Sequence, residues 1–177
     1  MFITIFEKLR GTKKMIFKQT RIGKNGDPFV VYKFRSIPKG ATLPNTWGKF
    51  LRKTKFDELP QIINIWKGEM AIIGPRPDIS GYADALQGED RIILSVKPGI
   101  TGLASLKYRK EEAFLDNLEN PNEYNDNIIW PDKVLINKWY IQNRNLKMDI
   151  QIIFFTLFPF PFNVDLFIEK NKTRNTK

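Results

Sequence analysis

Hydrophobic and polar residues alternate in two short segments near the N-terminus of the chain. Residues 16–19 and 29–35 are strand-like, and Gly23-Lys24-Asn25-Gly26 lies between them. Because Asn-Gly tolerates the positive φ angles of a tight turn, this pattern predicts a β-hairpin. We expect the hairpin to serve mainly as a structural ribbon.

Helical spacing replaces the alternation further along the chain. Trp47, Phe50 and Leu51 fall at i, i+3 and i+4, which predicts a short helix. A second apolar stripe with helical spacing follows, formed by Leu59, Ile62, Ile63 and Trp66. The pattern therefore predicts two consecutive amphipathic helices after the hairpin.

The start of the second helix can be located from its proline. Pro60 lacks an N–H and would break a helix interior, but the first turn tolerates it, so the helix should begin within a residue or two of Asp57. Gly68 is the expected stop. Asp57 and Glu58 would then occupy the helix N-terminus, where free N–H groups and the helix dipole keep a carboxylate ionised and attract phosphate.

Two segments rich in glycine and proline come next. A short buried strand is expected at 70–73, followed by Gly74-Pro75-Arg76-Pro77, a stiff loop that can hold an arginine in place. Later, residues 97–102 (Lys-Pro-Gly-Ile-Thr-Gly) permit a tight turn and a close approach of backbone amides to a phosphate. Taken alone, most segments of this kind are only loops and turns.

Apolar residues crowd the region after Asp149. They are Ile150, Ile152, Ile153, Phe154, Phe155, Leu157, Phe158, Phe160 and Phe162. The segment is too short to span a bilayer, which takes about 20 residues. It is equally consistent with partial burial at a membrane interface and with an ordinary helix packed on the core.

Composition narrows the chemistry. A chain of 177 residues is expected to form one domain, and its net charge of +10 favours polyanionic partners such as nucleic acid, anionic lipid or phosphorylated substrates. The chain has no histidine and no cysteine. Imidazole bases, thiolate nucleophiles and Cys/His zinc sites are thereby excluded, which leaves Asp, Glu, Lys, Tyr or a hydroxyl as nucleophile.

The adjacent carboxylates Asp57 and Glu58 are the first candidates for that chemistry. An ionised Asp57 could attack phosphorus if cations such as Arg52, Arg76 or Lys55 neutralise the phosphoryl oxygens. Glu58 could bind Mg²⁺ or accept a proton. Helix capping is the commoner reason for an acidic pair at a helix start, so spacing alone favours capping over catalysis.

The order of the motifs is more specific than any one of them. The chain contains, in sequence, Tyr32-Lys33-Phe34-Arg35-Ser36, Leu51-Arg52, Phe56-Asp57-Glu58-Leu59-Pro60-Gln61, Lys67-Gly68-Glu69-Met70, Ile73-Gly74-Pro75-Arg76-Pro77, Pro98-Gly99-Ile100-Thr101-Gly102-Leu103 and a late Asn143-Arg144-Asn145-Leu146-Lys147-Met148-Asp149. This order closely resembles the bacterial sugar transferase family, the monotopic phosphoglycosyl transferases. The resemblance covers about residues 16 to 158.

The resemblance implies a reaction and a set of site residues. Enzymes of this family move a phospho-sugar from a UDP-sugar to a polyprenyl phosphate, usually undecaprenyl phosphate, and release UMP. Asp57 would be the nucleophile that forms a covalent phospho-sugar intermediate, and Glu58 would help to bind Mg²⁺ or activate the lipid phosphate. The substrate-binding residues would be Lys33, Arg35, Arg52, Arg76, Pro77, Gly99, Thr101 and Gly102. Ala104-Ser105-Leu106 departs from the family, whose members often place Gln there.

The expected organisation is a mixed α/β, helix-rich single domain with an N-terminal hairpin and interfacial amphipathic segments. Residues 1–15 would be a divergent N-terminus without the family's re-entrant membrane helix, 16–162 the catalytic domain and 163–177 a polar tail. We expect the protein at the cytoplasmic face of a bacterial inner membrane, in contact with anionic lipid.

Two other functions are compatible with parts of the sequence. An inactive membrane-surface or partner-binding protein on the same scaffold would account for the divergent N-terminus. A basic nucleic-acid-binding module would account for the charge, but the sequence shows no zinc-finger spacing, RNP-like strand or helix-turn-helix pattern, so no nucleic-acid partner is expected.

Overall fold

The predicted hairpin forms at the start of the described chain. The structure is a computed structural model that describes residues 15–158 and 160–172. Strand β1 (Ile16–Ile22) pairs antiparallel with β2 (Pro28–Phe34), so that Ile16 lies opposite Phe34. The connecting turn η1 (Lys24–Gly26) has positive φ at Asn25 (62°) and Gly26 (90°). The Asn-Gly prediction is confirmed, and β1 extends three residues past the predicted strand.

Both predicted helices follow, and the second begins as a 3₁₀ turn. Helix α2 (Thr46–Thr54) is capped by the Asn45 side chain, which accepts a hydrogen bond from the Gly48 amide at 2.8 Å. The chain reverses at Lys55, which has φ of 59°. The 3₁₀ helix η2 (Phe56–Gln61) then leads into α3 (Ile62–Trp66), with Pro60 inside η2. The predicted helix start near Asp57 is confirmed.

A small parallel sheet joins two segments that are distant in sequence. Strand β3 (Ala71–Ile73) pairs with β4 (Gly99–Thr101), with Ala71 opposite Gly99. The 3₁₀ helices η3 (Ala83–Ala85) and η4 (Gly88–Ser95) lie between these strands in sequence. The pairing brings the stiff 74–77 loop beside the glycine turn at 97–102.

Helices make up the remainder of the described chain. They are α4 (Leu103–Lys107), α5 (Glu111–Leu115), α6 (Pro121–Tyr124), the π-helical turn η5 (Asn125–Ile129), α7 (Trp130–Asn143), α8 (Leu146–Leu157) and α9 (Val164–Lys172). A core of Leu103, Ala104, Ile136, Tyr140, Met148, Ile152 and Val164 ties α4, α7, α8 and α9 together. A second cluster, Ile22, Ala83, Ile93 and Leu94, fixes the hairpin to η3 and η4.

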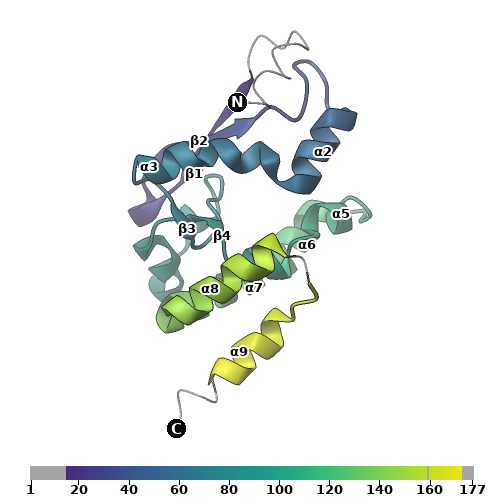
Figure 1. Ribbon diagram of the computed structural model, residues 1–177. Coiled ribbons are helices and arrows are strands. Elements are labelled where there is room, and N and C mark those ends of the chain that lie inside the picture. The colour runs from purple at the N-terminus through teal and green to yellow at the C-terminus, as the bar shows by residue number, and fades with distance from the viewer. Residues whose placement is uncertain (1–14, 159, 173–177) are drawn as a thin grey trace.

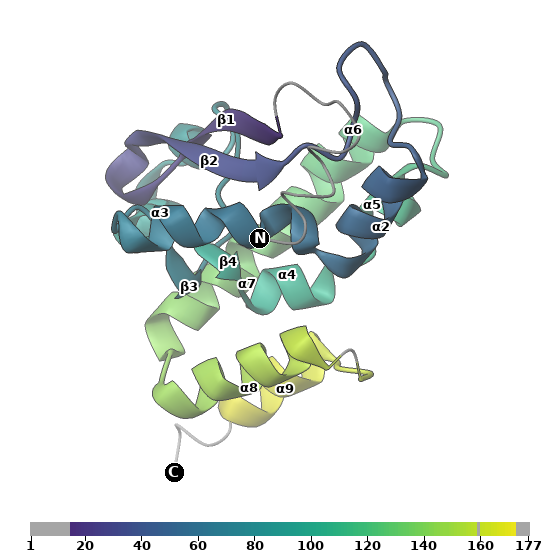
Figure 2. The same cartoon turned by 45° about the horizontal axis from the view of Figure 1, so that its top comes forward.

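The elements stack in a simple order. Figures 1 and 2 both show β3 and β4 between the η2–α3 row and helix α8. In Figure 2, η2–α3 lies under the hairpin and α8 lies beside α9 at the far end of the molecule. The predicted mixed α/β, helix-rich fold with an N-terminal hairpin is confirmed.

The C-terminal region combines the two roles left open for residues after Asp149 and adds a helix within the expected polar tail. Helix α8 buries Met148 and Ile152 but exposes Ile150, Phe154 and Leu157, so it is both a core helix and an apolar surface. Residues 164–172 of the segment expected as a polar tail form α9, because Val164, Phe167 and Ile168 pack on the core. Within the described residues, the structure contains no helix with the length and apolar character needed to span a membrane. The expected N-terminal segment 1–15 lies outside the described residues except for Met15.

Candidate active site

The acidic pair lies in the first turn of η2, enclosed by the hairpin. Asp57 and Glu58 are 9% and 6% exposed. Beneath them, the fully buried Asn64 donates hydrogen bonds to the Val30 carbonyl and the Glu69 carboxylate, each at 2.7 Å. This buried amide fixes α3 against β2 and thereby sets the position of the acidic pair.

Glu58 is held by two cations. Arg76 donates from Nη2 to Oε1 and from Nη1 to Oε2, the latter at 3.3 Å, and the Lys33 ammonium lies 3.2 Å from Oε1. Burial alone would raise the pKa of Glu58, but Arg76 and Lys33 outweigh burial and bring the pKa to about 2. Glu58 is therefore a fixed anion at neutral pH.

Asp57 contrasts with its neighbour. Its Oδ1 atom is buried and has no hydrogen-bond partner among the described residues. Burial raises the pKa of Asp57, the charge of Glu58 raises it further, and Lys33, Lys55 and Arg52 act in the opposite direction. A buried carboxylate oxygen without a donor is costly, so this atom is the polar group of the site whose hydrogen-bonding need the described residues do not meet.

The acidic pair only partly fits the Mg²⁺ ion that the family resemblance implies. Within the described residues, no cluster of three or more acidic side chains could hold a metal by itself. Both Glu58 oxygens already accept hydrogen bonds from cations, whereas Asp57 Oδ1 has no hydrogen-bond partner among the described residues. Mg²⁺ commonly takes one or two carboxylates and completes its shell with water and substrate phosphate. Asp57 fits that role better than Glu58.

The glycines of both loops explain how Arg76 reaches Glu58. A Cβ atom at Gly99 would lie 2.2 Å from the Gly74 nitrogen, and a Cβ at Gly102 would lie 2.3 Å from the Gly74 oxygen. The amide of Gly74 donates to the Thr101 carbonyl at 2.9 Å. Such close packing of two backbone segments requires glycine, and it fixes the loop that carries Arg76.

The same contacts give the predicted phosphate-binding turn a different role. The Gly99 amide donates to the Pro75 carbonyl at 2.8 Å, and the Thr101 hydroxyl hydrogen-bonds Thr156 at 2.8 Å. The Pro77 carbonyl accepts from Arg21 at 3.3 Å. These groups already have partners, so the structure favours a scaffolding role for Gly99, Thr101, Gly102 and Pro77.

The other cationic side chains predicted for the site contact different partners. Lys33 reaches Glu58, as described above. Arg52 forms an ion pair with Glu112 of α5, although its charge still acts on Asp57. Arg35 lies over the Phe17 ring at 5.6 Å. The structure therefore brings Lys33 and Arg76 to Glu58, and Arg35 to the ring of Phe17.

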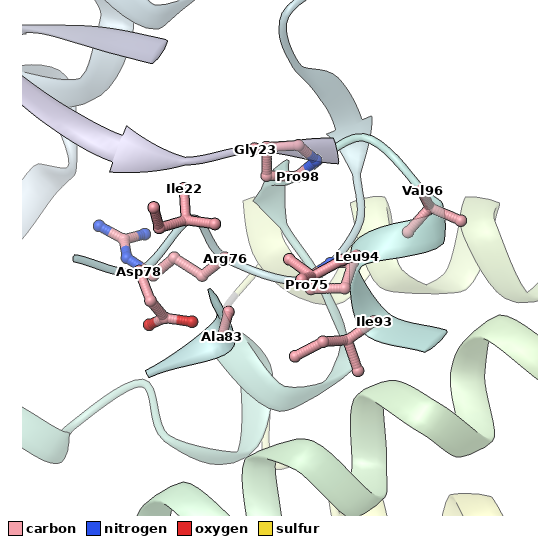
Figure 3. A pocket seen from close by; sticks show the side chains of 10 residues that line it. All are labelled: Ile22, Gly23, Pro75, Arg76, Asp78, Ala83, Ile93, Leu94, Val96 and Pro98. Carbon is pink, nitrogen blue, oxygen red and sulfur yellow. The ribbon is translucent and has the colours of Figure 1, made fainter. Parts of the chain in front are cut away.

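Arg21 and Asp78 were missed by the sequence analysis. Asp78 follows the 74–77 loop directly, and Figure 3 shows it near Arg76, with its carboxylate in the direction of Ala83. Burial raises the pKa of Asp78 to about 6, although Lys133, Arg21 and Arg76 oppose the shift. The enclosed space here measures only about 10 Å³, room for no more than a water molecule. Its position after Pro-Arg-Pro was the one signal that could have identified Asp78.

The site places two carboxylates beside a lysine and an arginine, and such cations suit the negative charge of a phosphoryl group. The family model described as "Bacterial sugar transferase" matches residues 1–161, and the chain belongs to this family. The match includes the N-terminal residues that the sequence analysis treated as divergent.

Individual relatives agree with this assignment. An uncharacterized sugar transferase, EpsL, of Bacillus subtilis is 31% identical over 89% of this chain and 75% of its own length. A UDP-glucose:undecaprenyl-phosphate glucose-1-phosphate transferase of Klebsiella pneumoniae is 35% identical over 89% of this chain. An undecaprenyl-phosphate galactose phosphotransferase of Salmonella typhimurium is 30% identical over 80% of it. The chain spans about a third of the length of the last two relatives.

Proposed function

We propose that the protein transfers a sugar phosphate from a UDP-sugar to undecaprenyl phosphate through a covalent intermediate on Asp57. Family membership and the names of the relatives support the reaction class. The observation that carries the nucleophile assignment is the buried Asp57 Oδ1 atom, which lacks a hydrogen-bond donor. An oxygen already engaged by several donors, like those of Glu58, would be a poorer nucleophile.

The reaction proceeds in two displacements. In the first, an Asp57 oxygen attacks the β-phosphorus of the donor, and the bond from that phosphorus to the bridging oxygen breaks, so that UMP leaves. In the second, a phosphate oxygen of the lipid attacks the same phosphorus, and the acyl phosphate bond breaks. Asp57 is regenerated as a carboxylate, and the product is a lipid diphospho-sugar.

The surrounding charges serve this sequence. Lys33 and Arg76 pair with Glu58, the neighbour of Asp57, and would offset part of the charge of a phosphoryl group bound at Asp57. Glu58 keeps both cations in place. Mg²⁺ bound by Asp57 and the diphosphate would stabilise the leaving UMP. These cations would also lower the pKa of Asp57 and favour its ionised, nucleophilic form.

The reaction is tested with purified protein in vesicles that contain undecaprenyl phosphate. UMP release is followed with Mg²⁺ and a panel of UDP-sugars. Without the lipid acceptor, the wild-type protein should gain the mass of one phospho-sugar, and Asp57→Asn should neither gain this mass nor turn over. Asp116→Asn, a change at an exposed carboxylate, is the matched control and should remain active. A fully active Asp57→Asn protein contradicts the mechanism.

We also propose that the enzyme works on a membrane surface, at the cytoplasmic face of the bacterial inner membrane. The apolar stripe predicted for α3 points outward: Trp66 is 91% exposed and Ile62 68% exposed, and Leu59 and Ile63 are also exposed. Exposed apolar residues of β3 and the α8 region, Ile72, Ile150, Phe154, Leu157, Phe158 and Phe160, add to this surface. Helix α3 buries the polar Asn64 and exposes the apolar Trp66, so its outer side suits an apolar environment. The net charge of +10 favours a surface of anionic lipid.

A further inference from the structure

A pocket separate from the acidic pair opens beside α5. Its volume is about 280 Å³, and its walls come from the end of α4, from α5, from α6 and from the π-helical turn η5. The residues that define it here are Tyr108, Lys110, Glu111, Phe114, Tyr124 and Ile128. We call it the α5 pocket. Its size is close to the lower end of the range for small-molecule sites, about 300 Å³.

One wall of the α5 pocket is aromatic. The rings of Phe114 and Tyr124 lie 5.4 Å apart at an angle of 58°, and both side chains are more than a third exposed. The π-helical turn carries the exposed Ile128 to the same pocket. Turns of this kind are rare and often occur at functional sites. An exposed, tilted aromatic pair offers its faces to the C–H groups of a sugar ring or to a planar base.

The other wall is polar and charged. The Glu111 carboxylate accepts two close contacts from the Lys133 ammonium, at 2.8 and 2.6 Å, which hold it in place. A carboxylate has about four acceptor positions, so Glu111 can still accept from ligand hydroxyls. Lys110 is exposed, and its ammonium forms no ion pair with any residue in the described part of the chain. The pocket therefore combines an apolar face with a hydrogen-bond acceptor, Glu111, and a hydrogen-bond donor, Lys110.

One ion pair links α5 to α2, the helix that precedes the acidic pair. Glu112, the neighbour of Glu111 on α5, binds Arg52 of α2, and the charge of Arg52 acts on Asp57. In a nucleotide diphospho-sugar, the sugar is joined to the attacked phosphorus through one oxygen, whereas the base is separated from it by a phosphate and a ribose. The link between α5 and α2, together with the acceptor and donor groups of Glu111 and Lys110, suits the hydroxyl-rich sugar better than the base.

We propose that the α5 pocket binds the sugar ring of the nucleotide-sugar donor and selects among donor sugars, with Phe114 and Tyr124 against the ring face and Lys110 and Glu111 on its hydroxyls. This inference rests on the proposed function. The pocket would also retain the sugar on the covalent intermediate after UMP has left. Residues outside the α5 pocket would then bind the nucleotide.

The test compares Phe114→Ala, Tyr124→Ala and Lys110→Gln with the wild-type protein. The control is Leu135→Ala, a change at an exposed leucine of α7 that does not line the pocket. For each protein, kcat/KM is measured with a panel of UDP-sugars, together with the inhibition constant of UDP, which lacks the sugar. Loss of one aromatic contact should lower kcat/KM for the preferred donor roughly two- to tenfold and change the ranking of donors. The inhibition constant of UDP should stay within about twofold, as expected for a nucleotide bound elsewhere.

Each other outcome overturns the inference. If UDP inhibition weakens in parallel with every donor, the pocket binds the base. If no variant alters any donor, the pocket is not used. Lys110→Gln changes only an exposed side chain, so it still tests the pocket if the aromatic variants fail to fold. Calorimetry can also measure the binding of UDP-sugar and of UDP to Asp57→Asn proteins that carry each pocket change. This measurement separates sugar binding in the α5 pocket from the proposed transfer reaction, because it reports on binding even if the wild-type protein releases no UMP.

Discussion

Arg76 places both terminal nitrogens of its guanidinium on the carboxylate of Glu58, across 18 positions of sequence. The residue next to Glu58, Asp57, keeps a buried oxygen without a donor. One carboxylate of the pair is therefore fixed by cations and the other is open to a ligand. This asymmetry follows from the 74–77 loop, which brings arginine to only one of the two.

The Arg76–Glu58 contact should depend on the fork geometry of arginine. Arg76→Lys keeps the charge but loses the two-point contact, so we expect at least a tenfold loss of UMP release with a modest loss of stability. Arg76→Ala leaves the buried Glu58 with Lys33 alone and should cost about 1–2 kcal/mol in the free energy of unfolding, a value reduced because Arg76 is partly exposed. Urea unfolding and UMP release measure the two effects. An Arg76→Lys enzyme with wild-type activity would show that charge alone suffices.

Asp78 should make stability depend on pH. Its pKa is raised to about 6 in the fold, so its favourable, neutral form is fully present below about pH 4 and is lost as the pH rises through 6. Asp78→Asn mimics the neutral form. We compare the free energy of unfolding of Asp78→Asn with that of the wild type at each pH. The advantage of the variant should be about 1–3 kcal/mol larger at pH 8 than at pH 4. Denaturant unfolding at both pH values measures the difference between the two proteins, and an equal difference at the two pH values would count against the burial of Asp78.

The contact between the two glycine loops should not tolerate a side chain. A Cβ at Gly102 would lie 2.3 Å from the Gly74 carbonyl oxygen, a backbone atom that cannot move away as a flexible side chain could. Gly102→Ala should therefore cost about 2–3 kcal/mol and displace Arg76. Gly40→Ala is the control: φ there is +86° but no atom lies within 4 Å, so only strain of about 1 kcal/mol is expected. Thermal unfolding measures the loss of stability of both variants, and equal losses for Gly102→Ala and Gly40→Ala would contradict the packing argument.

The outward apolar face should govern membrane binding. Trp66→Ser combined with Ile62→Ser removes two exposed apolar side chains, so the protein should float with anionic vesicles to a smaller extent, by roughly tenfold in partition coefficient. Leu43→Ser changes a leucine that is 75% exposed in the segment between β2 and α2, which Figure 2 shows far from α8. This control should bind vesicles like the wild type. Equal flotation of all three proteins would rule out α3 as the contact surface.

Local patterns predicted much of the fold. The Asn-Gly turn, the Pro60 position and the helical spacing after Asn45 led to the hairpin, to the start of η2 and to α2. These features depend on backbone preferences of a few neighbouring residues, which tertiary contacts did not override. The helical spacing of Leu59 to Trp66 also predicted a stripe correctly, but periodicity cannot tell whether a stripe faces a core or the outside.

The sequence by itself excluded imidazole and thiolate chemistry, because the chain has no histidine or cysteine, and its motifs made Asp57 and Glu58 the first candidates for the site. Only the tertiary structure decided which member of the pair is clamped, that Gly99 and Gly102 hold a loop, and that Arg52 pairs with Glu112. The physical reason is distance along the chain. Arg76, Lys33 and Glu112 reach their partners from 18 to 60 positions away, and burial and charge at Asp57 depend on those long-range contacts.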